Sequence, residues 1–152
     1  MSKFKVAVAC DHGGLELKNK IKEYLQSNGY EICDFGTNST ESCDYPDFAL
    51  PASEAVASGK CERGIIVCTT GIGVSMVANK VPHVRCALCH VTFGAELTRR
   101  HNDANVLALG GKVVGEECAL KIVDTFLKTE FEGGRHQRRV DKITAVEKKY
   151  SK

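Results

Sequence analysis

The chain has 152 residues, of which 26% are charged and 43% hydrophobic, and its formal net charge is +2. These values are typical of a soluble globular protein, and the length predicts a single domain over residues 1–152. The small net charge argues against a nucleic-acid or membrane-surface partner. The N-terminal apolar run is too short for a signal peptide and no stretch is long enough to span a membrane, so we expect a cytoplasmic protein.

Apolar, β-rich runs alternate with helical patterns along the chain. Strands are predicted at residues 4–10, 30–35, 63–68, 84–89 and 106–109. Helices are predicted before Gly29 and at about 46–58, 73–80, 92–102, 115–129 and 136–150. Five βα units in succession predict an α/β fold of three layers, in which helices cover both faces of a five-stranded parallel, Rossmann-like sheet. An extra C-terminal helix follows. The order of the strands beyond the first three is not specified by the pattern.

The chain contains eight cysteines, at positions 10, 33, 43, 61, 68, 86, 89 and 118. Because there is no export signal and the core is large enough without cross-links, we expect reduced thiols. Residues 86–90, CALCH, match the pattern for covalent haem attachment. In a strand, however, Cys86 and Cys89 face opposite sides, and a single C-x-x-C lacks the second ligand pair of a structural zinc site. We therefore expect no metal and no cofactor.

Ligands of parallel sheets bind beyond the carboxyl ends of the strands, so the residues there are candidates for function. The first strand ends in CDHGG, residues 10–14, and the third ends in CTTGIG, residues 68–73. A glycine loop that opens a helix offers backbone N–H groups and the positive end of the helix dipole to an anion. This pattern fits a nucleotide loop, a phosphate loop or an oxyanion hole equally well. It is neither a Walker A loop nor the dinucleotide fingerprint.

Cys68 is the cysteine whose position itself indicates reactivity. It lies where a strand meets the glycine loop, and the N–H groups and helix N-terminus beside it favour the thiolate form. The alternative is a buried, inert cysteine that closes the strand. We adopt that alternative for the other seven cysteines.

Two further polar groups lie near predicted helix ends. His101 and Asn102 come at the end of the helix at 92–102, where the helix dipole stabilises an imidazolium that can act as an acid. A histidine that caps the last carbonyls is equally compatible with this position. Arg135 and Arg139 are four residues apart in the terminal helix, so they share a face and repel each other unless an anion such as phosphate binds. The alternative is a solvated basic face.

Five motifs occur in order over nearly the whole chain. They are ACDHGG (9–14), DYPDFA (44–49), CTTGIGVSMVANK (68–80), RRHNDANVLALGG (99–111) and EGGRHQRRV (132–140). Together they resemble the ribose 5-phosphate isomerase B family, which also contains the allose 6-phosphate and galactose 6-phosphate isomerases. The resemblance implies an enzyme of the pentose phosphate pathway that interconverts ribose 5-phosphate and ribulose 5-phosphate through an enediolate, without a cofactor. A six-carbon sugar phosphate is the alternative substrate.

The resemblance also implies catalytic roles. Cys68 corresponds to the base that moves a proton between C2 and C1, and Thr70 assists it. His101 corresponds to the residue that opens the furanose ring. A branch of the family uses a glutamate base in the glycine loop, but this chain has Val74 there, and valine cannot accept a proton.

Contacts with the substrate follow from the same resemblance. The implied substrate-binding residues are Asp11, His12, Tyr45, Gly71, Ile72, Gly73, Asn102, Arg135 and Arg139. The backbone amides of the glycine loop would hold the enediolate oxygen, Asn102 would help ring opening, and the two arginines would grip the phosphate. Some members make a further basic contact with an arginine, which corresponds to Lys112 here. Lysine replaces a bidentate clamp by a point charge.

Family members are dimers whose sites draw residues from both chains, so the resemblance implies a homodimer, possibly paired into a dimer of dimers. We expect the terminal helix to carry Arg135 and Arg139 to the neighbour's Cys68. Two other classes compete with the isomerase. A flavodoxin-like phosphate-binding module explains the fold and the anion loop, and a thiol redox protein explains a reactive cysteine, although no C-x-x-C lies at a strand-to-helix turn.

Overall fold

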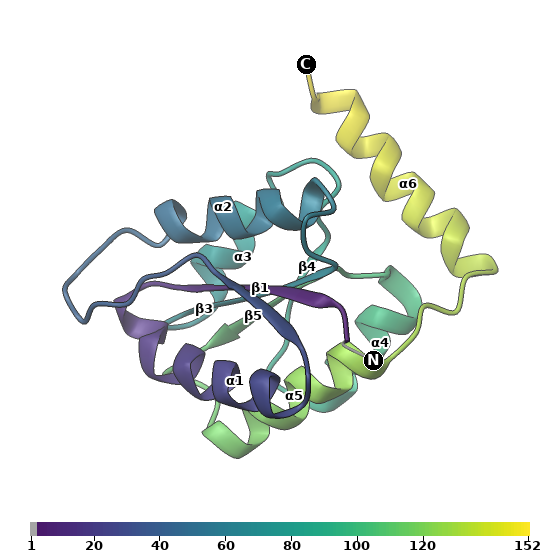
Figure 1. Cartoon of the computed structure of the whole chain (residues 1–152). Coiled ribbons are helices and arrows are strands. Elements are labelled where there is room, and N and C mark those ends of the chain that lie inside the picture. Colours follow the sequence, from purple (N-terminus) through teal and green to yellow (C-terminus); the bar gives the residue numbers. More distant parts are fainter. Residues whose placement is uncertain (1–2) are drawn as a thin grey trace.

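The structure, a computed structural model, describes residues 3–152 and forms three layers (Figure 1). Its strands are β1 (Lys5–Cys10), β2 (Glu31–Asp34), β3 (Arg63–Cys68), β4 (Cys86–Leu88) and β5 (Val106–Gly110). Its helices are the 3-10 turn η1 (His12–Gly14), α1 (Leu15–Ser27), α2 (Pro46–Ala57), α3 (Ile72–Ala78), α4 (Thr92–Asn102), α5 (Glu116–Lys128) and α6 (Arg135–Tyr150). The predicted fold class is confirmed, because the five strands are parallel and helices cover both faces of the sheet.

The strand order is β2-β1-β3-β5-β4. The chain winds from β1 to β2 on one side and then returns to place β3 on the other side of β1. The carboxyl ends of β1 and β3 therefore flank the point where the winding direction changes, which is where open α/β sheets bind ligands. In register, Cys10 lies beside Val67, and Cys68 lies beside Gly110. The ends of β1, β3 and β5 thus meet at one edge.

The two faces of the sheet bury different kinds of side chain. Helices α1, α4 and α5 cover one face with large residues such as Ile21 and Phe126. Helices α2 and α3 cover the other, where alanines such as Ala49 and Ala108 predominate. Small residues let α2 and α3 approach the sheet closely, because no long side chain separates backbone from backbone. Figure 1 shows the two helix layers on either side of the sheet.

Strand β4 is shorter than predicted, with three residues in place of six. A side chain explains the difference at its amino end. Asn105 Oδ1 accepts a hydrogen bond from the N–H of Arg85 at 2.8 Å, just before the strand. The side chain therefore satisfies a donor that a longer strand would use.

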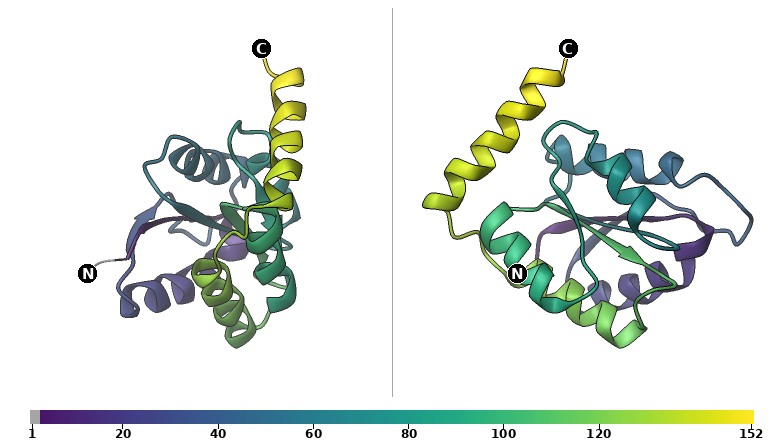
Figure 2. Two further views of the ribbon diagram at one scale, coloured as in Figure 1. Left: turned by 90° about the vertical axis from the view of Figure 1, so that its right-hand side faces the viewer. Right: turned by 180° about the vertical axis from the view of Figure 1, so that it is seen from behind.

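Helix α6 projects from one end of the molecule (Figures 1 and 2), and in its far half Glu147 Oε2 accepts a hydrogen bond from the His83 N–H at 3.0 Å. Of its residues only His136 and Val140 are buried, and both lie in its first half, which packs on α4. Its far half exposes Ile143, Val146 and Tyr150. Among residues 3–152, no helix combines the length and the apolar character that crossing a membrane requires.

A buried lysine ties α1 to the loop after β2. Lys18 is 1% exposed, and its Nζ donates to both carboxylate oxygens of Asp34 at 2.9 and 3.1 Å, to the Thr37 carbonyl at 2.6 Å and to Asn38 Oδ1 at 3.0 Å. Burial alone would raise the pKa of Asp34, but hydrogen bonds from Lys22, the Gly36 N–H and Lys18 together lower it. The buried ammonium is thus fully paired, as a charge in the interior must be.

We expect Lys18→Met to lower the free energy of unfolding by about 3 kcal/mol, because it leaves buried oxygens without a donor. Lys22→Met is the matched control, since Lys22 is partly exposed and bonds only Asp34, so its loss should cost less than about 1 kcal/mol. Because the folded pKa of Asp34 is lowered, its stabilising effect is present above about pH 4 and is lost as the pH falls through the folded value. Denaturant unfolding of both variants measures the difference, and equal losses would contradict it.

Candidate active site

The loops after β1, β3 and β5 converge at the carboxyl edge of the sheet. A Cβ on Gly13 would collide with Thr69 Oγ1, and one on Gly111 would lie 2.9 Å from the Gly13 carbonyl oxygen. The Gly111 N–H donates to the Cys68 carbonyl at 2.8 Å. Backbone thus packs directly against backbone here, which a larger residue would prevent, and the three loops form one surface.

Cys68 ends β3 and is 5% exposed. Its Sγ accepts a hydrogen bond from the Gly71 N–H at 3.1 Å. This geometry places Gly71 in the left-handed region, at a φ of 78°, and a Cβ there would lie 2.6 Å from Leu88 Cδ1. The Gly71 N–H thus holds the Cys68 sulfur against the glycine loop, at the carboxyl end of β3.

Four other cysteines, of which Cys86 is partly buried and three are buried, lie in environments that oppose ionisation. Burial raises the pKa of Cys10, Cys61 and Cys89 to about 11 each, and it raises the pKa of Cys86 further. All eight cysteines, which lie within residues 3–152, are free thiols. Cys86 and Cys89 face opposite sides of the sheet, as predicted: Cys89 packs with the α1, α4 and α5 layer, while Cys86 packs with the α2 and α3 layer.

The loop after β1 holds two predicted residues in defined positions. Asp11 is buried, and its Oδ1 accepts hydrogen bonds from the N–H groups of Gly13 at 2.9 Å and Gly14 at 3.1 Å. It therefore caps η1, as short acidic side chains do at helix starts. His12 Nδ1 accepts a hydrogen bond from the Cys43 N–H at 3.2 Å, which ties the loop before α2 to this edge.

Tyr45 and Thr70 complete the same edge. Tyr45 precedes α2, and its ring packs so closely on Gly73 that a Cβ there would lie 2.6 Å from it. Thr70 Oγ1 accepts a hydrogen bond from the Ile72 N–H at 3.2 Å. The structure thus brings eight predicted residues to the carboxyl edge: Asp11, His12, Tyr45, Cys68, Thr70, Gly71, Ile72 and Gly73.

A hollow of about 560 Å³ opens at this edge. His12, Lys20 and Lys112 line it, together with Glu16 and Glu116. Lys112 is exposed, and its N–H donates to the Thr69 carbonyl at 3.0 Å, so its position beside the glycine loop is fixed. The Lys20 ammonium lies 3.9 Å from Glu116 Oε1, so Lys112 and His12 are the groups of the hollow that remain for an anion.

His101 and Asn102 lie at the opposite edge of the sheet. Helix α4 starts beyond the carboxyl end of β4 and runs back against the strand direction, so its last residues reach the amino edge. Shortly after it, the Asn105 carbonyl accepts a hydrogen bond from the N–H of Gly64, near the start of β3. Cys68 is four residues further along that strand, a rise of about 13 Å. A single chain therefore does not bring His101 to Cys68.

Arg135 and Arg139 belong to the amino-edge group as well. Both are exposed on the first turns of α6, which begins where the segment after α5 passes α4. The Glu132 N–H donates to the Arg100 carbonyl at 3.1 Å, which fixes that passage. The predicted residues thus fall into two groups, with four of them, His101, Asn102, Arg135 and Arg139, at the amino edge.

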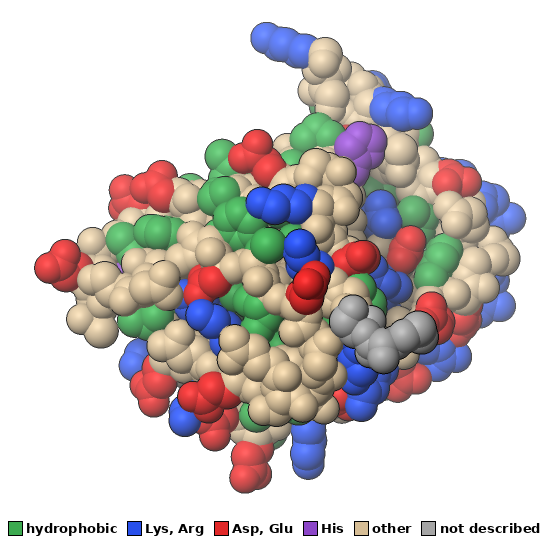
Figure 3. All heavy atoms as spheres, in the orientation of Figure 1, with side chains coloured by type: hydrophobic (Ala, Val, Ile, Leu, Met, Phe, Trp, Pro, Cys, Tyr) green, Lys and Arg blue, Asp and Glu red, His purple; other side chains and the backbone are tan. Residues whose placement is uncertain are grey.

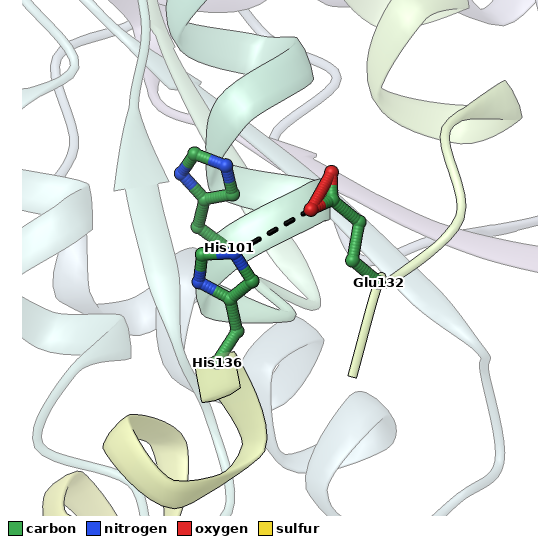
Figure 4. Close-up of side chains that lie close together, drawn as sticks. All are labelled: His101, Glu132 and His136. Atoms are coloured by element: carbon green, nitrogen blue, oxygen red, sulfur yellow. Dashed lines mark ion pairs between the residues drawn. The ribbon is translucent and has the colours of Figure 1, made fainter. Parts of the chain in front are cut away.

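The structure also places two residues beside His101 that the sequence analysis missed. The ring of His136 stacks on that of His101, and Glu132 Oε1 lies 3.4 Å from His136 Nε2 (Figure 4). Both residues fall in the EGGRHQRRV motif, so the sequence did mark this segment. The motif does not indicate that the segment packs against α4. The ligand atoms of the three side chains lie within 4.8 Å of one another. Parallel stacked rings cannot both direct a nitrogen lone pair at one ion, so this arrangement does not fit a metal centre.

Acidic and basic side chains are interspersed over the face shown in Figure 3. This agrees with the small net charge of the chain. The surface field on this face is therefore mixed, and local groups rather than a broad potential must attract an anion.

Comparisons with known proteins identify the family of the chain. A family model described as Ribose/Galactose Isomerase matches residues 6–143. The chain is 48% identical over 145 residues to ribose-5-phosphate isomerase B of Escherichia coli, covering 95% of this chain and 97% of that protein. It is 43% identical over 139 residues to D-erythrulose-4-phosphate isomerase of Pectobacterium atrosepticum, covering 91% of each.

Solved structures agree. The ribose-5-phosphate isomerase B of Clostridium thermocellum superposes with a TM-score of 0.96 at 56% sequence identity, covering 97% of this chain and 99% of that one. The resemblance drawn from the five motifs is thereby confirmed. The chain belongs to the ribose/galactose isomerase family and is an isomerase of sugar phosphates.

Proposed function

We propose that the protein interconverts ribose 5-phosphate and ribulose 5-phosphate, with Cys68 as the base. The observation that carries the proposal is the Cys68 thiol at the switch point of the sheet, with the Gly71 N–H 3.1 Å from its sulfur. The relatives support the substrate, since proteins that are 48% and 56% identical to this chain are named ribose-5-phosphate isomerase B. A cofactor is not needed, because moving a proton between adjacent carbons leaves the oxidation state of the whole molecule unchanged.

In the proposed reaction, the Cys68 thiolate takes the proton from C2 of the open aldose and returns it to C1. The proton of the C2 hydroxyl passes to the oxygen on C1, so that a ketone forms at C2 and a hydroxyl at C1. The negative charge moves to the carbonyl oxygen, where N–H groups of the glycine loop stabilise it. The Gly71 and Ile72 N–H groups already bond Cys68 Sγ and Thr70 Oγ1. The enediolate oxygen must therefore accept hydrogen bonds from these two N–H groups together with, or in place of, Cys68 Sγ and Thr70 Oγ1. When the Ile72 N–H bonds the substrate, the Thr70 hydroxyl is free to turn toward the substrate as well.

Ring opening comes first in the aldose direction. The furanose oxygen takes a proton from the His101 imidazolium as its bond to C1 breaks, and the C1 hydroxyl releases a proton as the aldehyde forms. Asn102 adjoins His101 and assists by hydrogen bonding. Asp11, His12 and Tyr45 contact the sugar or its phosphate, and Arg135 and Arg139 hold the phosphate, whose remote binding energy orients the reacting carbons.

We further propose that two copies of the chain form each site. His101 and Cys68 lie at opposite edges of one sheet, so the acid and the base of one site must come from different chains. A two-fold dimer supplies both combinations at once. The exposed far half of α6 supports this assembly, because Ile143, Val146 and Tyr150 are 47%, 59% and 77% exposed and lie along the helix that carries the two arginines. Apolar side chains that line one such helix mark an interaction surface.

The direct test mixes the purified protein with ribose 5-phosphate and follows the appearance of ribulose 5-phosphate. Allose 6-phosphate, galactose 6-phosphate and erythrose 4-phosphate form the comparison panel. We expect the highest kcat/KM for ribose 5-phosphate. A preference of tenfold or more for another sugar phosphate would contradict the proposed substrate. Such a preference would not contradict the proposed role of Cys68 as the base.

We expect His101→Asn to separate ring opening from proton transfer. The variant should slow turnover of ribose 5-phosphate by about 10²-fold, because it lacks the acid for the ring oxygen. It should retain the exchange of the C1 proton of ribulose 5-phosphate with solvent deuterium, since that ketose is open-chain and needs only the base. Proton NMR in heavy water measures the exchange. Equal loss in both assays would contradict the assigned role.

A further inference from the structure

The stacked pair of histidines joins α6 to α4 at the proposed acid itself. The ring centroids of His101 and His136 are 4.2 Å apart, and the ring planes differ by 9° (Figure 4). His136 is 6% exposed, whereas His101 is only partly buried. The inner ring is therefore held by its surroundings, and the outer ring is free to meet a substrate on its open side.

The inner ring faces Glu132, a residue of the segment between α5 and α6 that α4 holds in place. Glu132 Oε1 faces His136 Nε2 at 3.4 Å, and the Glu132 carboxylate also accepts a hydrogen bond from Arg100 Nε. Arg100 Nη1 donates to Glu96 Oε1 at 3.0 Å, one turn earlier in α4. The contacts thus form a closed path that starts on α4, passes through Glu132 and His136, and returns to His101.

The surroundings of His136 oppose its protonation. Burial lowers the pKa of His136, and the neighbouring His101, Arg135 and Arg139 lower it further, while Glu132 acts in the opposite direction. Two stacked imidazolium ions would also repel each other. The buried ring is therefore a neutral, flat surface against which the His101 ring packs.

We propose that His136 is a positioning residue for His101, fixing the plane in which the His101 imidazole presents its proton to the sugar ring. The inference rests on the proposed role of His101 in ring opening. The flat, buried face of His136 removes the rotation about the Cβ–Cγ bond that an exposed histidine would otherwise have. A misdirected proton donor costs catalysis even when it is present, because proton transfer needs aligned donor and acceptor.

The test compares His136→Leu with His136→Phe. Both fill the buried space with an apolar side chain, but only phenylalanine offers a flat ring to His101. We expect His136→Leu to lower turnover of ribose 5-phosphate by about tenfold and to leave the deuterium exchange of ribulose 5-phosphate within about twofold of wild type. His136→Phe should restore most of the lost turnover. His83→Asn is the control for loss of a histidine near α6, since the His83 side chain is exposed and asparagine tolerates its φ of 73°.

Three outcomes would overturn the inference. They are equal loss of turnover and exchange in His136→Leu, no loss in either assay, and no advantage of phenylalanine over leucine. Equal loss of both activities in His136→Leu would show that His136 only supports the fold. No advantage of phenylalanine over leucine would show that ring stacking does not affect His101. Measuring His101→Asn in parallel separates the two proposals. If His101→Asn spares exchange and His136→Leu does not, only the positioning role fails, whereas equal loss of both activities in His101→Asn removes the ring-opening role itself.

Discussion

Replacing Cys68 by alanine should lower the turnover of ribose 5-phosphate by at least ~10²-fold, the scale expected when a general base is lost. Val74, the nearby loop residue at which the resemblance implies a glutamate base in one branch of the family, cannot accept a proton. The variant should also lose the deuterium exchange at C1, because that exchange needs the same base. Loss of both activities distinguishes Cys68→Ala from His101→Asn, and steady-state kinetics with proton NMR measures both.

Cys61→Ala is the matched control for a buried cysteine. Cys61 is 1% exposed and lies in the segment before β3, at the amino edge, and burial raises its pKa to about 11. We expect the control to keep turnover near the wild-type value and to lose about 1 kcal/mol of the free energy of unfolding. Near-native turnover of Cys68→Ala, with its fold verified by circular dichroism, would remove Cys68 from the mechanism.

Mixing two inactive variants should restore activity if each site draws on two chains. Cys68→Ala and His101→Asn, unfolded and refolded together in equal amounts, form hybrid dimers as half of the population. Each hybrid has one site with both lesions and one site with none. About a quarter of wild-type activity should therefore return under random pairing in a symmetric dimer. Recovery is measured as turnover per mole of chain, with hybrids verified by mass.

A second mixture tests the assignment of residues to edges. Asp11 and Cys68 lie at the same edge of one chain, so Cys68→Ala refolded with Asp11→Asn leaves one lesion in every hybrid site. We expect no recovery from this pair. Recovery from it, or none from Cys68→Ala with His101→Asn, would contradict the proposed division of the site between chains.

Local patterns predicted most of the fold because each βα unit carries its own signals. The alternation of short apolar runs with amphipathic helices located five strands and six helices to within a few residues. The order of β5 and β4 depends on which edge each crossover selects, and no local pattern encodes that choice. The length of β4 was overestimated for a related reason, since the Asn105 side chain bonds the N–H of Arg85 just before the strand.

The candidate site could be predicted only in parts. Cys68 and its glycine loop are contiguous in sequence, so their proximity followed from the chain itself. The stack of His101 on His136 joins residues 35 positions apart through the turn at Gly133 and Gly134, whose φ values of 68° and 55° set the direction of α6. That direction is a property of the folded backbone, and the sequence pattern contained only two unconnected histidines.

The separation of base and acid to opposite edges of one sheet has a genetic consequence. In the proposed assembly, each chain contributes halves of two different sites, so inactivating alleles fall into two complementation groups. Alleles that damage the Cys68 edge restore function with alleles that damage the His101 edge, and fail with alleles of their own group. A single damaged allele of either group leaves every hybrid with one intact site, so half of the activity persists and the lesion is recessive wherever half suffices.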